Sequence, residues 1–74
     1  MSEQKETLLK WDYILPNYQI QKSVYDKFTY TIEYSNKKYT LYITIGETKD
    51  HINGNLTIGK LKRLAEKDLK RRIV

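Results

Sequence analysis

The sequence contains no cysteine, one proline, three glycines and one histidine among its 74 residues. Without cysteine, the chain forms no disulfide bond, cysteine-ligated zinc site or iron–sulfur cluster, and it has no thiol chemistry. No apolar run approaches the roughly 18 residues that a membrane span requires, and no signal-peptide core follows the first methionine. We therefore expect an intracellular, cytoplasmic protein without a membrane partner.

The familiar catalytic and nucleotide-binding motifs are also missing. The sequence has no Gly-rich phosphate loop, dinucleotide-binding fingerprint, nucleophile elbow or H-E-x-x-H zinc motif. The one imidazole, His51, follows Asp50 in a polar segment that we expect to be a loop. This pair could bind a metal or transfer a proton, but a lone loop histidine is usually solvated. We expect no enzymatic activity, no cofactor and no metal site.

The length leaves room for one small domain. A chain of 74 residues hides only about 60% of the surface that its unfolded form exposes, so its stability margin should be thin. Hydrophobic residues make up 39% and charged residues 31%, which is typical of a folded chain and too apolar for a disordered one. We expect a single domain over residues 1–74 with a frayed N-terminus at residues 1–7.

Residues 27–46 carry the clearest structural signal, because apolar and polar residues alternate in two runs. If Asn36 and Lys37 form a two-residue turn, every apolar residue of the first run faces an apolar residue of the second. This agreement predicts a β-hairpin with one apolar face. The expected cross-strand pairs are Tyr34 with Tyr39, Ile32 with Leu41, Tyr30 with Ile43 and Phe28 with Ile45.

From Ile58 onward the apolar spacing changes from two residues to three and four, which predicts an amphipathic helix over about 58–72. Thr57 can cap it, because its hydroxyl can accept a hydrogen bond from an unpaired amide of the first turn. We expect this helix to cover the apolar face of the hairpin and give a two-layer fold. The apolar stripe consists of Ile58, Leu61, Leu64, Ala65, Leu69 and Ile73.

The remaining segments give weaker patterns. We expect one further strand within residues 8–22, where apolar residues recur at a period of two, and a short helix over residues 3–10 is the alternative. Residues 46–57 are polar and predict a loop, with a possible short strand near 56–58. The predicted fold is a small α+β domain in which an antiparallel sheet packs against one C-terminal helix.

The positive charge is concentrated at the C-terminal end. The lysines and acidic residues of 1–59 balance, so the net charge of +5 comes from the last part of the chain. A concentrated positive surface attracts nucleic acid or an acidic protein face over a Debye length of about 8–10 Å. A structural explanation is also available, because the helix dipole favours cations near a C-terminus. The bases are Lys60, Lys62, Arg63, Lys67, Lys70, Arg71 and Arg72.

Tyrosine is the other abundant residue type, with seven copies. Its flat, amphipathic ring stacks on bases and anchors protein interfaces. Tyr30, Tyr34 and Tyr39 fall on the predicted core face, and we assign them to packing. Tyr42 falls on the opposite face with several hydroxyl groups and with Lys38 at the edge. That face could lie against a nucleic-acid backbone, or it could be a solvated outer surface.

These observations favour a small basic nucleic-acid-binding protein, with DNA favoured over RNA, whose C-terminal helix contacts phosphates. The sequence identifies no base-reading residue. The candidate contacts are Lys60, Lys62, Arg63, Lys67, Lys70, Arg71 and Arg72, with Lys38 and Tyr42 on the outer face.

The alternative is a virus- or phage-encoded inhibitor that binds and blocks a host protein, such as a defence or nucleic-acid enzyme. Such a protein needs only a stable scaffold and one complementary patch, and a basic helix with exposed tyrosines provides one. Lysine, isoleucine, tyrosine and asparagine are abundant, and their A/T-rich codons are typical of low-GC genomes, including those of viruses. We expect a monomer, and the edge of the hairpin is where a homodimer would form.

Overall fold

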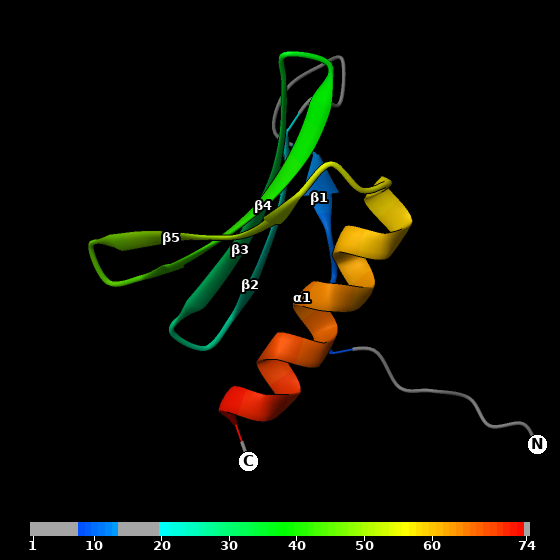
Figure 1. The fold of residues 1–74 in the computed structure, drawn as a ribbon. Coiled ribbons are helices and arrows are strands. Elements are labelled where there is room, and N and C mark those ends of the chain that lie inside the picture. Colours follow the sequence, from blue (N-terminus) through cyan, green and yellow to red (C-terminus); the bar gives the residue numbers. More distant parts are fainter. Residues whose placement is uncertain (1–7, 14–19, 74) are drawn as a thin grey trace, which may run out of the picture.

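The computed structural model describes residues 8–13 and 20–73 (Figure 1). The described residues form one antiparallel sheet with the strand order β1-β2-β3-β4-β5, followed by one C-terminal helix. The prediction of a small α+β fold is confirmed, whereas the expected frayed segment 1–7 lies outside the described residues. The elements are β1 (Asp12–Tyr13), β2 (Ile20–Tyr25), β3 (Phe28–Ser35), β4 (Lys38–Ile45), β5 (Thr48–Gly54) and α1 (Ile58–Arg72).

The hairpin formed by β3 and β4 has the register expected from the sequence. Tyr34 lies opposite Tyr39 and Phe28 opposite Ile45, with the intervening apolar pairs in step. The connecting residues Asn36 and Lys37 have φ angles of 52° and 64°. Positive φ at both central residues is what a type I′ turn requires, and this turn twists in the same sense as the strands it joins.

Lysine at position 37 is a strained choice for this turn. A side chain with a Cβ atom disfavours the left-handed region, and glycine adopts it without a steric cost. We expect Lys37→Gly to stabilise the protein by about 0.5–1 kcal/mol, measured by urea unfolding. Lys37→Ala is the control, since it removes the charge but keeps the Cβ atom. If the alanine variant is stabilised as much as the glycine variant, backbone strain is not the cause.

Helix α1 covers one face of the sheet and supplies one side of the core (Figure 1). Thr57 is the N-cap, as expected, because its Oγ1 accepts a hydrogen bond from the amide of Lys60 at 3.3 Å. Leu61, Ala65 and Leu69 are fully buried. They are spaced four residues apart, which brings them to the same face of the helix. The buried hydrophobic core consists of Leu9, Phe28, Tyr30, Ile32, Leu41, Ile43, Leu61, Ala65 and Leu69.

Two tyrosines assigned to the core lie at its margin. Tyr34 is 37% exposed and Tyr39 is half-buried, and their rings contact each other with centroids 4.8 Å apart. They form the apolar pair nearest the β3–β4 turn, and this end of the hairpin projects beyond α1 (Figure 1). Among the three tyrosines, the core assignment is confirmed in full only for Tyr30.

Strand β5 occupies most of the segment that was predicted to be a loop. The prediction of a short strand near 56–58 is wrong, because these residues form no strand and α1 begins at Ile58. As the edge strand beside β4, β5 is held by backbone hydrogen bonds and keeps most of its side chains in solvent, so it needs few apolar residues. A β-bulge also interrupts the pairing: Leu41 lies opposite Asn53 and Tyr42 opposite His51. The bulge breaks the period of two by which a strand is recognised in sequence.

The N-terminal third contains two strands where one was expected. The short β1 and the longer β2 pair with each other, and β2 continues past residue 22 to Tyr25. The core-facing positions of β2 are polar, since Gln21 and Ser23 are both buried. The apolar alternation that predicted a strand within residues 8–22 therefore does not continue along the core-facing side of β2. Residues 8–10 are not helical, and the rest of the alternative helix over 3–10 lies outside the described residues.

The edges of the β3–β4 hairpin are covered, by β2 on one side and β5 on the other. The hairpin edge at which a homodimer would have formed is therefore occupied within the chain. Among the described residues, β5 is instead an edge strand of the sheet. The prediction of a monomer remains a prediction.

Candidate nucleic-acid interface

Five bases form one exposed stripe along α1, and we refer to them as the basic stripe. They recur at intervals of three and four residues, which brings them to one side of a helix with 3.6 residues per turn. This side is opposite to Leu61, Ala65 and Leu69, which are buried against the sheet. Among the described residues, none of the five forms an ion pair. The basic stripe consists of Lys60, Arg63, Lys67, Lys70 and Arg71.

The two acidic residues of α1 are bound by groups outside the stripe. The carboxylate of Glu66 accepts hydrogen bonds from the amides of Leu8 at 2.6 Å and Leu9 at 3.3 Å. This contact holds the N-terminal segment against the helix and places Leu9 in the core. The Glu66 carboxylate is therefore occupied by backbone donors, and among the described residues it forms no ion pair with a base of the stripe.

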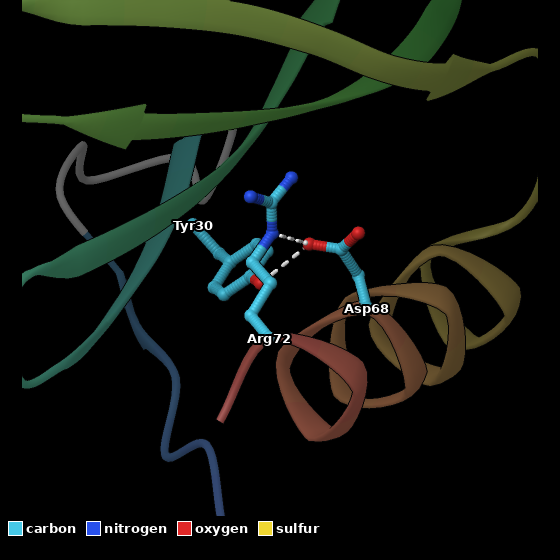
Figure 2. A network of polar contacts seen from close by, with 3 residues as sticks. All are labelled: Tyr30, Asp68 and Arg72. Atoms are coloured by element: carbon cyan, nitrogen blue, oxygen red, sulfur yellow. Dashed lines mark hydrogen bonds and ion pairs between the residues drawn. The ribbon is translucent and has the colours of Figure 1, made fainter. Parts of the chain in front are cut away.

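Asp68 joins α1 to the sheet through a polar network (Figure 2). Its Oδ2 accepts hydrogen bonds from the Tyr30 hydroxyl and from Nε of Arg72, each at 2.7 Å. Burial by itself raises the pKa of the Asp68 carboxyl, but the hydrogen bonds from Arg72 and Tyr30 outweigh it and hold that pKa below its usual value. Burial and the neighbouring carboxylate raise the pKa of the Tyr30 hydroxyl, so it stays protonated and donates.

Two of the seven predicted helical bases stand outside the stripe. Arg72 is bound to Asp68. Lys62 is half-buried, and its ammonium group lies 5.7 Å from the ring centroid of Trp11, within the range of a cation–π contact. The sequence contained a sign of the first of these contacts, because Asp68 and Arg72 have the i,i+4 spacing of a helical ion pair.

Tyr42 and Lys38 lie on the face of the sheet that points away from α1, so the structure does not bring them together with the stripe. The Tyr42 ring is engaged by its neighbours. The ammonium group of Lys49 lies 4.4 Å from the ring centroid, and the same group forms an ion pair with Glu33 at 2.9 Å. Stacking of a base on Tyr42 would have to displace Lys49.

His51 is part of β5, so its assignment to a loop is wrong. It lies directly across from Tyr42, and the two rings meet edge to face with centroids 5.8 Å apart. Among residues 8–13 and 20–73, no cluster of three or more His, Asp or Glu side chains is positioned to hold a metal ion.

A hollow of about 410 Å³ lies beside the basic stripe, and sequence reasoning did not anticipate it. The leucines at positions 56 and 64 are half-buried and pack against the core, and they form the apolar part of its lining. Leu64 was expected simply to face the core. The lining residues are Leu56, Lys60, Arg63, Leu64 and Lys67.

Comparisons with known proteins find no matching protein-family model, curated protein or solved structure. In the part of the chain that the structure describes, no helix has both the length and the apolar character needed to cross a membrane.

Proposed function

We propose that this chain is a small basic nucleic-acid-binding protein that contacts the phosphates of duplex DNA through the basic stripe of α1. The observation that carries the proposal is the group of five exposed bases on the side of the helix opposite the core, none of which has an ion-pair partner within residues 8–13 and 20–73. Such bases are free to release counterions from a polyphosphate, which is the main source of sequence-independent affinity.

The dimensions of α1 support duplex DNA over duplex RNA. A helix is about 10–12 Å across with its side chains, and the major groove of B-DNA, at about 12 Å, admits one. The major groove of A-form RNA is deep and too narrow for side chains to read. The 15 residues of α1 extend over about 22 Å, and the exposed face runs along most of that length.

The proposal predicts a strong dependence of affinity on salt. With about five phosphates neutralised, a plot of log K against log salt concentration should have a slope of about −4.5. Replacing both Arg63 and Lys67 by glutamine should reduce the slope to about −2.7, because two contacts are lost. Fluorescence anisotropy of a labelled duplex in a series of salt concentrations measures this, and thermal unfolding checks that the variant is folded.

The matched control removes the same charge from the other side of the protein. Lys22→Gln combined with Lys38→Gln changes two exposed lysines on the outer face of the sheet, and it should leave the slope close to that of the wild type. If the control variant makes the salt dependence less steep and the helix variant does not, the outer face of the sheet is the interface. If the wild type binds no DNA or RNA probe at low salt, the proposed function is wrong.

A further inference from the structure

We propose that the hollow beside the basic stripe receives the C5 methyl groups of thymine, so that the protein prefers thymine-containing duplex DNA. The inference rests on the proposed function and adds a base preference to it. The first observation is location. Three stripe residues line the hollow, so a duplex bound along the stripe would also cover it.

The second observation is the chemistry of the lining. On the helix surface Leu64 has Lys60 four residues before it and Lys67 three residues after it, so an apolar side chain stands between two cations. Phosphates satisfy the cations but leave the exposed part of the Leu64 side chain uncovered, since only its other part packs against the core. Covering apolar surface is favourable only when it meets apolar surface, at about 25 cal/mol per Å².

Duplex DNA presents one apolar group on its base edges in the major groove. Among the four bases, only thymine carries a methyl group there, and the other groups that distinguish the base pairs are hydrogen-bond donors and acceptors. The hollow, at about 410 Å³, has room for such a methyl group together with the edge of its pyrimidine ring. Because Leu56 and Leu64 pack against the core, the apolar lining of the hollow is held in position when the duplex binds.

The test compares two duplexes of the same A·T-rich sequence, one with dT and one with dU at every thymine position. The two differ only in the methyl groups. We expect the wild type to bind the dU duplex about fourfold more weakly for each methyl that it buries. Replacing cytosine by 5-methylcytosine near the binding site should recover part of the loss, because it returns a methyl group to the major groove.

Protein variants link this preference to the hollow. In Leu64→Ala the ratio of dT to dU affinity should fall towards one, and Leu56→Ala should give the same result from outside the helix if the first variant is poorly folded. Ile58→Ala is the matched control, because Ile58 is a half-buried apolar residue of α1 that does not line the hollow, and its ratio should stay at the wild-type value.

The outcomes separate this inference from the proposed function. Equal binding of dT and dU duplexes by the wild type, with the expected salt slope intact, overturns the thymine preference alone. A preference that survives in both leucine variants also overturns it, because the methyl groups then bind elsewhere. If neither duplex binds at low salt and a leucine-containing acidic peptide does, the hollow belongs to a protein partner and both proposals fail.

Discussion

Replacing Leu69 or Leu61 by alanine is expected to destabilise the protein by about 2–5 kcal/mol. Both side chains are fully buried between α1 and the sheet, in the same core as Tyr30 and Leu41. Truncation removes their transfer free energy and leaves a cavity that a small domain cannot easily close. Since folded domains of this size have only a small net stability, either variant loses a large share of it and can unfold at room temperature.

Urea unfolding followed by circular dichroism measures this loss. Ile73→Ala is the matched control, because Ile73 lies just after the same helix but is 42% exposed, so its truncation should cost less than about 0.5 kcal/mol. If Ile73→Ala costs as much as Leu69→Ala, the packing of α1 against the sheet does not provide the stability. The Arg63 and Lys67 variants should unfold like the wild type, so that one side of the helix carries stability and the other carries binding.

Removing the carboxylate of Asp68 is expected to cost about 1–3 kcal/mol at neutral pH. In Asp68→Ala the Tyr30 hydroxyl stays in a fully buried residue without its acceptor, and Arg72 loses its partner. Tyr30→Phe combined with Asp68→Ala tests this explanation. The double variant should be less destabilised than the sum of the two single variants, because the hydroxyl that lacks an acceptor is absent. Additive losses would show that the two side chains do not act together.

The stabilisation by Asp68 should depend on pH in one direction. The folded pKa of this carboxyl is below its ordinary value of 3.8, so as the pH falls past that value the unfolded chain takes up the proton first. The stabilisation by Asp68 is fully present above the ordinary pKa of 3.8 and is lost as the pH falls through the lower pKa of the folded state. The stabilities of the wild type and Asp68→Asn should therefore converge in acid when both are measured by urea unfolding.

An exposed acid provides the comparison for that pH series. Asp50 lies on β5 and forms no ion pair among the described residues, so Asp50→Asn should retain the acid-dependent loss seen in the wild type. If Asp68→Asn loses stability in acid as steeply as the wild type does, the carboxylate of Asp68 is not the group responsible.

Local periodicity was sufficient to predict the elements that have a regular pattern. The hairpin register followed from the alternation on both sides of Asn36 and Lys37, because a shift by one residue would turn every apolar side chain to the other face. The helix bounds followed from Thr57 and from the spacing of three and four, and both agree with α1. The positive charge of the helix could also be read directly, since charge depends on composition alone.

Tertiary structure decided the features that depend on residues far apart in the chain. β5 forms because β4 offers it a row of backbone partners, and neither its polar residues nor its bulge carries a strand pattern. Asp68 and Tyr30 are separated by 38 positions and meet only when α1 packs on the sheet. The contact of Lys62 with Trp11 likewise joins residues that are far apart in the chain. Side-chain pairing depends on three-dimensional proximity, which a one-dimensional pattern does not contain.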